Sequence, residues 1–276
     1  MGLFTKLRYF RLTRKFHDYR PQPITQEGIA AWFRQFSHQD IKGVQTLLNS
    51  VIYLSEQRVQ QILLDQNNAL VLRLKRAKIT QEKTIYVSVH DAGSSSPVML
   101  NLLRDAAKLE RTGCYLIDGN NGLLLNKITN QLGEGAIVYV DDFAGTGNQF
   151  CKTRQFISQS IVGNFSEFLL APCMCEEAVH RLGQEGVDFY TGLIHSKAER
   201  PLHENSTILA PEVKERLRQI SLGIHGRMGL GFAQLATMVV LYRNAPNTMP
   251  LILRGARDQV GFHGIFPRTT DLPIPD

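Results

Sequence analysis

The residues best suited to chemistry stand at the end of one apolar run, in the stretch AIVYVDDFAGTGNQF at positions 136–150. The run stops at Asp141 and Asp142, and a glycine-threonine-glycine turn follows at 145–147. Glycines let a loop turn several backbone N–H groups toward one point, and a helix that begins behind such a loop favours an anion. The turn therefore predicts a site for one phosphate group.

The two carboxylates would repel that phosphate, so they must face a different part of the ligand. Carboxylates accept hydrogen bonds from ribose hydroxyls and also bind divalent cations. A sugar phosphate satisfies both halves of the motif. The two glycines, Gly145 and Gly147, would turn their N–H groups toward the phosphate, and Thr146 and Asn148 can add side-chain donors. The motif is not a Walker loop, since no Gly-Lys-Ser/Thr follows it, and it lacks the glycine spacing of a dinucleotide fingerprint.

The elements that must hold this motif alternate along the second part of the chain. TIYVSV, AIVYV, EFLLAP and DFYTGLI have the composition of strands, and stretches such as PVMLNLLRDAAKL and NQFCKTRQFI are typical of helices. Alternation of this kind predicts an α/β fold, with a mostly parallel sheet flanked by helices, over residues 83–276. Ligands bind such sheets at the carboxyl ends of the strands, where AIVYV places both acids.

Residues 24–82 favour a small helical domain ahead of that sheet. Three helical patterns start near residues 26, 41 and 56, and the stretch at 69–89 alternates as a strand pair would. Three helices and a hairpin predict a winged helix-turn-helix-like domain, which often binds duplex nucleic acid. Its wing would present Arg73, Lys75 and Arg76 to phosphates. The alternative is a domain that serves only interaction or dimerisation.

Residues 1–23 form a basic N-terminal arm that carries most of the chain's excess positive charge. The chain has a formal net charge of +6, and Asp18 is the arm's only acid. Arginines neutralise phosphates and aromatic rings stack on bases, so the arm's mixture of both suits nucleic acid. The candidate contacts are Arg8, Arg11, Arg14 and Lys15. The alternative is a terminal helix whose aromatic side chains pack on the body.

The motif at 137–150 resembles the phosphoribosyl pyrophosphate (PRPP) motif of type I phosphoribosyltransferases: four apolar residues, two acids, two variable residues, a small residue, then Thr-Gly. Gln149 departs from it, because the family usually has a threonine there. Over about residues 24–268 the chain further resembles the phosphoribosyltransferase-like effectors of bacterial conflict systems, including those encoded beside retron reverse transcriptases. The closing segments LATMVVLYRNAPNTMPLIL and FHGIFPR contribute to this likeness.

The resemblance implies roles for individual residues. Asp141 and Asp142 take the ribose and catalytic roles, and Ala144 to Asn148 hold the 5-phosphate. A second loop after TIYVSV would hold pyrophosphate or metal, with PRPP or a nucleotide as ligand and Mg²⁺ as cofactor. That loop offers His90, Asp91, Gly93, Ser94 and Ser95.

The implied function is a toxic effector of a retron-type antiphage system that acts at the anomeric carbon of a ribose phosphate. Its expected partners are a retron reverse transcriptase with its RNA and DNA product. The alternatives are a transcription regulator, or a structural nucleic-acid-binding subunit, with an inactive phosphoribosyltransferase-like domain. The sequence leaves the oligomeric state open, and both a monomer and an oligomer agree with it.

The chain's location is expected to be the cytoplasm. No apolar run approaches the roughly 20 residues that span a bilayer, and the beginning lacks the uninterrupted apolar core of a secretory signal. The four cysteines, Cys114, Cys151, Cys173 and Cys175, lack zinc-knuckle spacing and are typical of reduced thiols.

Overall fold

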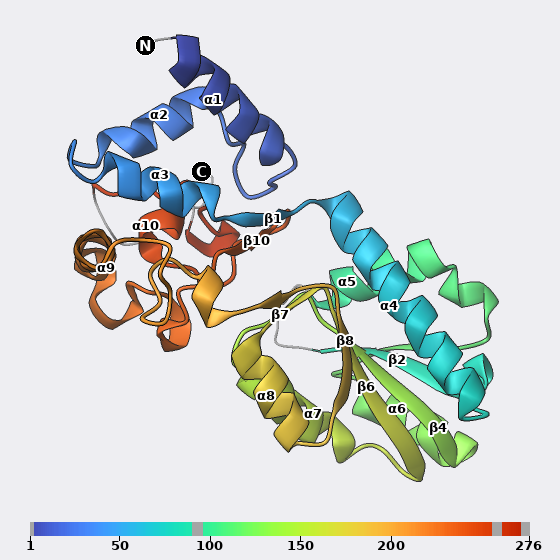
Figure 1. The fold of residues 1–276 in the computed structure, drawn as a ribbon. Helices are drawn as coiled ribbons and strands as arrows, with labels where there is room; N and C mark the ends of the chain where they lie inside the picture. The colour runs from blue at the N-terminus through green and yellow to red at the C-terminus, as the bar shows by residue number, and fades with distance from the viewer. Residues whose placement is uncertain (1–2, 90–95, 256–260, 272–276) are drawn as a thin grey trace. The chain divides into compact units, whose positions relative to one another are not determined.

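The structure is a computed structural model that describes residues 3–89, 96–255 and 261–271, and the chain divides into two compact units (Figure 1). One, called here the α/β unit, is residues 57–194. The other, called here the split unit, combines residues 1–56 with residues 195–276. This division differs from the boundaries at residues 23 and 82 that the sequence suggested. The reason is that the N-terminal helices share a core with the C-terminal segment rather than forming a domain of their own.

The split unit consists of helices and one pair of short strands. Its α-helices are α1 (Leu3–Lys15), α2 (Gln26–Arg34), α3 (Ile41–Asn49), α9 (Pro211–His225) and α10 (Leu251–Arg254). Its strands β1 (Ile52–Leu54) and β10 (Val239–Leu241) pair in parallel. Short 3-10 helices are η3 (Lys197–Glu199), η4 (Gly226–Met228), η5 (Phe232–Gln234) and η6 (Thr269–Asp271).

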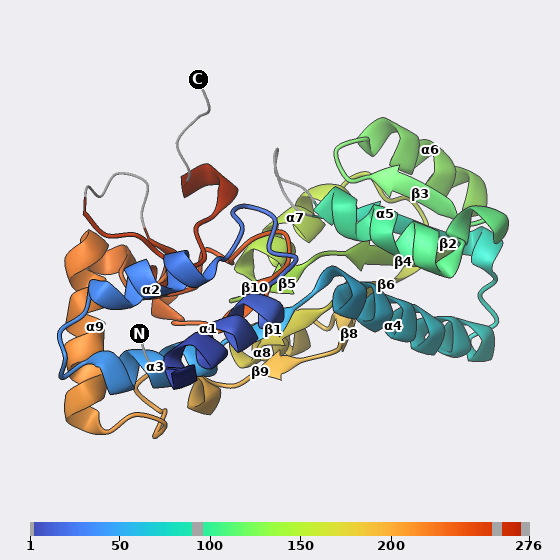
Figure 2. The ribbon, with the colours of Figure 1, turned by 90° about the horizontal axis from the view of Figure 1, so that it is seen from above.

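The core of the split unit joins residues far apart in the sequence. The buried indole of Trp32 donates to the carbonyl of Ile252 over 2.9 Å, and the Tyr19 hydroxyl donates to the carbonyl of Pro267 over 2.7 Å. Figure 2 shows α9 beside α3, an approach that Gly43 permits because a Cβ there would lie 2.5 Å from Val213 Cγ1. The C-terminal segment therefore completes the core that α1–α3 begin.

The α/β unit alternates strands and helices, as the sequence predicted. Its helices are α4 (Glu56–Arg76), α5 (Ser96–Ala107), α6 (Gly122–Leu132), α7 (Asn148–Ser158) and α8 (Glu176–Gln184), with 3-10 turns η1 (Gln81–Lys83) and η2 (Leu109–Arg111). Its main strands are β2 (Thr84–Ser88), β3 (Tyr115–Asp118), β4 (Glu134–Val140), β6 (Asn164–Ala171) and β8 (Asp188–Thr191). Shorter strands are β5 (Phe143–Ala144), β7 (Cys173–Cys175) and β9 (Ile194–His195), and the unit boundary falls within β9.

The five main strands form one parallel sheet in the order β3-β2-β4-β6-β8. Alternate residues of the strands face opposite layers of helices. Ile85, Ile137 and Leu169 belong to a core cluster that also contains residues of α6, α7 and α8. Tyr86 points to the other side, where its hydroxyl donates to Asn67 of α4 over 2.6 Å. The predicted α/β fold with helices on both faces of a parallel sheet is confirmed.

The hairpin predicted at 69–89 is wrong, because α4 continues unbroken to Arg76 and β2 pairs only with strands of the parallel sheet. The leucines at 70, 72 and 74 alternate like a strand. Leu70 and Leu74 are nevertheless one helical turn apart and buried, whereas Leu72 is 58% exposed. No glycine or proline interrupts residues 56–76. A wing is therefore absent from this described segment.

Within the residues that the structure describes, no helix has both the length and the apolar character to cross a membrane.

Candidate functional site

The strand order identifies the point of the sheet at which a ligand is expected to bind. From β2 the chain moves to β3 on one side, and from β3 it returns past β2 to β4, so the order reverses between β2 and β4. Crossover connections leave in opposite directions at such a switch point, which opens a crevice beyond the strand ends. Asp141 follows β4 directly, so the acidic pair stands at the switch point.

Ser96 ties the two strand ends together at this point. It is fully buried at the start of α5, and its hydroxyl accepts from the Val89 N–H over 2.5 Å while donating to the Val140 carbonyl over 2.6 Å. Val89 and Val140 are the residues from which the two candidate loops depart. Ser96 therefore links the two points from which the loops depart.

The Asp141 carboxylate is engaged with the loop that it begins. The backbone N–H of Asp141 donates to Leu170 O over 3.0 Å and so continues the hydrogen-bond ladder between β4 and β6. The Oδ1 atom of Asp141 accepts from the Asp142 N–H over 2.9 Å. Burial raises the pKa of Asp141 well above its usual range, and the neighbouring charge of Asp142 raises it further. Groups that bear hydroxyl protons or positive charge would stabilise this pair, because either one relieves the repulsion.

The loop after the acids is fixed to the rest of the unit. Phe143 and Ala144 pair in parallel with β7. The Asn148 N–H donates to Thr146 Oγ1 over 3.3 Å, and Gly147 has a left-handed conformation with φ of 76° immediately before α7. The first turn of α7 has no acidic residue, so its N-terminal N–H groups and dipole keep their preference for an anion. The role of Ala144–Asn148 in binding a phosphate stays a prediction.

Gly147 also identifies a residue that the sequence did not. A Cβ at this position would lie 3.3 Å from Ala178 Cα and 3.4 Å from both Cβ and Cγ of Arg181, so α7 begins in contact with α8. Arg181 Nη2 pairs with Glu185 over 2.7 Å, and Arg181 Nε has no hydrogen-bond partner among the described residues. The aliphatic part of the Arg181 side chain thus lies against the start of α7, while its guanidinium pairs with Glu185 on α8. Nothing in the spacing of EEAVHRL pointed to it.

The second predicted loop lies outside the described residues: His90, Asp91, Gly93, Ser94 and Ser95. Its role in binding pyrophosphate or metal stays a prediction. The described residues contain no cluster of three or more histidine, cysteine, aspartate or glutamate side chains that could hold a metal ion. Asp141 and Asp142 are a pair of hard oxygen donors. They suit Mg²⁺, which usually binds one or two carboxylates together with substrate phosphates.

The N-terminal arm is a helix whose aromatic side chains are mostly inside the split unit. Tyr9, Phe16 and Tyr19 are 9%, 0% and 3% exposed, and Phe16 packs edge-on against Phe266. Three of the rings expected to stack on bases are therefore core residues, because they lie on one face of α1 and its continuation. Among the rings of the arm whose burial the structure describes, Phe10 is the exception, at 48% exposed.

The four candidate basic residues of α1 differ in their contacts. Arg11 and Arg14 are exposed. Arg8 lies over the Phe33 ring at 5.7 Å, and Lys15 donates to the carbonyl of Val51 over 2.5 Å. Burial lowers the pKa of Lys15.

The basic residues predicted for the wing lie on the last two turns of α4. Arg73 pairs with Asp188 and stands over the Phe168 ring at 5.1 Å, so its charge is used within the α/β unit. Lys75 and Arg76 are exposed. Of these three residues, only the last two keep a side chain available to a polyanion.

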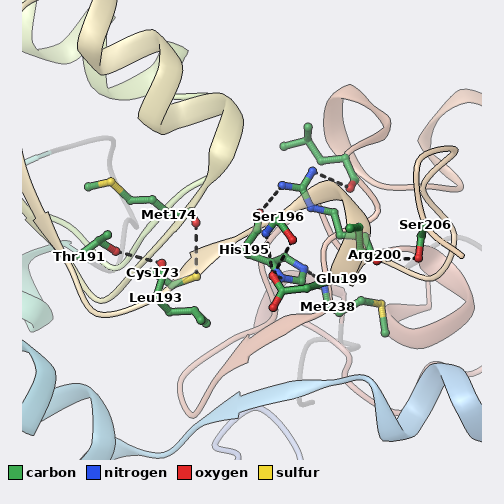
Figure 3. A network of polar contacts seen from close by, with 12 residues as sticks. Cys173, Met174, Thr191, Leu193, His195, Ser196, Glu199, Arg200, Ser206 and Met238 are labelled. Atoms are coloured by element: carbon green, nitrogen blue, oxygen red, sulfur yellow. Dashed lines mark hydrogen bonds and ion pairs between the residues drawn. The ribbon is translucent and has the colours of Figure 1, made fainter. Parts of the chain in front are cut away.

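The segment 195–206 is polar and aperiodic in sequence, a pattern that predicts a mobile loop over a site. Instead its side chains form a network inside the split unit (Figure 3). Arg200 is fully buried and donates to His195 O over 2.6 Å, and His195 Nε2 accepts from the Met238 N–H over 3.0 Å. Ser206 Oγ donates to Ala198 O over 2.8 Å. The segment is held by buried contacts and is not built as a lid.

Three solved structures are similar to parts of this chain. Orotate phosphoribosyltransferase from Aeropyrum pernix is 15% identical, with a TM-score of 0.33, over 49% of this chain and 68% of that one. A hypothetical protein from Neisseria gonorrhoeae with bound ppGpp is 13% identical, with a TM-score of 0.35, over 53% and 85%. The HGPRT-ase from Leishmania tarentolae in complex with GMP is 11% identical, with a TM-score of 0.32, over 52% and 80%.

No curated protein sequence matches the chain. A family model, PRTase-CE, matches residues 29–268. That match includes the whole α/β unit, with its acidic pair and predicted phosphate loop, and part of each half of the split unit, from residue 29 to 56 and from 195 to 268. The chain therefore belongs to the PRTase-CE family, a phosphoribosyltransferase-like family.

Proposed function

We propose that the chain binds the ribose 5-phosphate part of PRPP or of a nucleotide at Asp141–Asn148 and acts at the anomeric carbon. One observation carries this proposal: the acidic pair, the Thr146–Gly147 turn and the start of α7 follow one another at the switch point of the parallel sheet. Hydroxyl acceptors and an anion site then stand a few residues apart, as a sugar phosphate requires.

Within this site the residues divide the ligand between them. The N–H groups at the start of α7 and the Thr146 hydroxyl receive the phosphate. Asp141 and Asp142 receive the ribose hydroxyls. Because Asp141 Oδ1 already accepts from the Asp142 N–H, Asp141 shapes the turn as well as binding sugar, and Asp142 is the better candidate for proton transfer. In transfer the bond from the anomeric carbon to its leaving group breaks and one to the acceptor forms.

Mg²⁺ suits the same carboxylates. When bound it would neutralise the negative charge of a departing pyrophosphate. Asp141 and Asp142 would hold it, with the loop at His90–Ser95 as the second predicted contact. A cation here would also relieve the repulsion that raises the pKa of Asp141.

The biological role that we propose is a toxic effector of a retron-type antiphage system in the bacterial cytoplasm. The resemblance to conflict-system effectors supports this role, and the four free cysteines are compatible with a reducing compartment. The proposed partners are a retron reverse transcriptase and its RNA and DNA product. Nucleic acid would contact the N-terminal region at Arg11 and Arg14 and the end of α4 at Lys75 and Arg76.

The test is an inventory of nucleotides and PRPP by mass spectrometry in cells that express the chain or its variants. Depletion of one pool by the wild type, and its recovery with Asp141→Asn and Asp142→Asn together, is the expected result. Asp118→Asn is the matched control. Asp118 also ends a strand of the sheet, and its carboxylate likewise accepts from a nearby backbone N–H, that of Asn120, over 2.9 Å.

Toxicity that persists in the double variant with unchanged pools would contradict the enzymatic proposal. Binding is checked separately by calorimetry of the purified chain with ribose 5-phosphate and with ribose. We expect ribose 5-phosphate to give a heat of binding and ribose to give none, and we expect the double variant to lose this heat. A sequence-specific promoter complex without any change in the pools would favour a regulator instead.

A further inference from the structure

The outward face of α1 carries one narrow set of side chains, called here the outer stripe. It consists of Leu7, Phe10, Arg11 and Arg14, whose spacing of three, four and seven residues places them on one side of a helix. Leu7 is 50% and Phe10 48% exposed, and both arginines are exposed. Tyr9, Leu12 and Phe16 occupy the opposite face and are buried. The outer stripe is thus a surface that the core of the split unit does not use.

Its charge indicates an anionic partner. No acidic residue occurs anywhere in Leu3–Lys15, and the last turn of α1 contains Arg14 and Lys15. A helix of 13 residues is about 20 Å long, so the two exposed arginines, one turn apart, can meet successive phosphates of one strand. Such contacts depend on salt but not on base sequence.

The Phe10 ring indicates which class of polyanion the outer stripe would bind. The Arg14 guanidinium lies 6.0 Å from the centre of the Phe10 ring, so a cation and a flat apolar ring stand together. Unpaired bases stack on such rings, whereas a duplex keeps its base faces inside. A bilayer surface would use Leu7 and Phe10 alike, since it needs apolar area and not a ring. The ring and charge combination therefore fits single-stranded nucleic acid best.

We propose that the outer stripe binds single-stranded DNA or RNA, with one base stacked on Phe10 and the adjoining phosphates on Arg11 and Arg14. This inference rests on the proposed nucleic-acid contact of the N-terminal region. It is independent of the ribose-phosphate site.

The experiment measures fluorescence anisotropy of a labelled oligothymidine of about 15 nucleotides, a length near the upper end of single-strand site sizes. The full chain is titrated with it, with a duplex of equal length, and with vesicles containing phosphatidylserine. Phe10→Ala is expected to weaken single-strand binding by about tenfold. Leu7→Ala is the matched control, since it removes an equally exposed apolar side chain without a ring, and it is expected to leave binding unchanged.

The arginines are tested through the salt dependence. Arg11→Gln with Arg14→Gln should flatten the slope of log affinity against log salt by about 1.4, because each phosphate contact on a single strand contributes about 0.7. Circular dichroism confirms that each variant folds, as expected of exposed positions.

The outcomes test two claims separately: that α1 contacts nucleic acid, and that a base stacks on Phe10. An unchanged slope in the double arginine variant would refute nucleic-acid contact by α1 altogether. A flattened slope with equal effects of Phe10→Ala and Leu7→Ala would keep the contact and overturn the stacking. Tighter binding to the duplex, or to the vesicles, would overturn the choice of a single strand. None of these results bears on the sugar-phosphate pools that test the proposed reaction.

Discussion

Replacing Gly147 by alanine is the sharpest structural test of the phosphate loop. The residue has φ of 76°, a left-handed conformation that costs a side chain with a Cβ about 1 kcal/mol. The added Cβ would also lie 3.3 Å from Ala178 Cα, which belongs to the backbone of α8, and 3.4 Å from Arg181 Cβ and Cγ. Contacts this tight force small shifts of neighbouring elements, and such overpacking costs about 1–3 kcal/mol. We expect a total loss of roughly 2–4 kcal/mol.

Gly133 supplies a matched control for the conformational part. It has a similar φ of 68° and nothing within 4 Å of an added Cβ. Gly133→Ala should therefore lose only the conformational cost, about 1 kcal/mol. Urea unfolding of both variants gives the difference, which measures the packing of α7 on α8. Calorimetry with ribose 5-phosphate gives the second result: Gly147→Ala should lose binding and Gly133→Ala should retain it.

Two outcomes would refute this reasoning. Equal destabilisation by the two substitutions would show that α8 does not restrict the loop. Undiminished binding of ribose 5-phosphate by Gly147→Ala would show that the turn before α7 is not the phosphate site, whatever its effect on stability.

Three further predictions concern other sites. The raised pKa of Asp141 means that the folded chain holds its proton more tightly than the unfolded chain, so its contribution to stability is lost as pH rises from about 4 through that raised pKa. Asp141→Asn should therefore be more stable than the wild type at pH 8 in urea unfolding, and this gain should disappear below about pH 4. Ser96→Ala removes the buried hydroxyl that accepts from the Val89 N–H and donates to the Val140 carbonyl, and should cost about 2–3 kcal/mol of unfolding free energy. Tyr19→Phe removes the bond to the Pro267 carbonyl and should cost about 1 kcal/mol, measured by thermal unfolding.

The sequence predicts the α/β unit well because its signals are local. β4 is buried from Gly135 to Val140 and is apolar along that whole length, as a central parallel strand must be. The acids and the glycine turn that follow are one continuous stretch, so their positions at the strand end and the helix start follow from the chain itself. The predicted fold class is confirmed on these grounds, whereas the chemical roles of the acids stay predictions.

The remaining features depend on contacts between distant segments, which one sequence does not reveal. The Trp32 indole and its acceptor Ile252 are 220 residues apart. The spacing of Leu70 and Leu74 fits a strand and a helix equally well. Only the pattern of buried residues in the preceding turns shows that this segment is a helix. Arg181 reaches Gly147 by packing of α8 on α7, with no motif of its own.

The interrupted course of the split unit also affects the order in which the chain can fold as a ribosome makes it. The α/β unit is one continuous stretch and can fold as soon as residue 194 is free. The N-terminal helices must wait for Phe266, whose ring packs on Phe16 and Tyr19. Synthesis of the 210 residues between positions 56 and 266 takes about 10–40 s at 5–20 residues per second. Throughout that time the faces of α1 and α2 that bear Tyr9, Trp32 and Phe33 lack their final covering, which makes the nascent chain a candidate client for chaperones that hold aromatic segments.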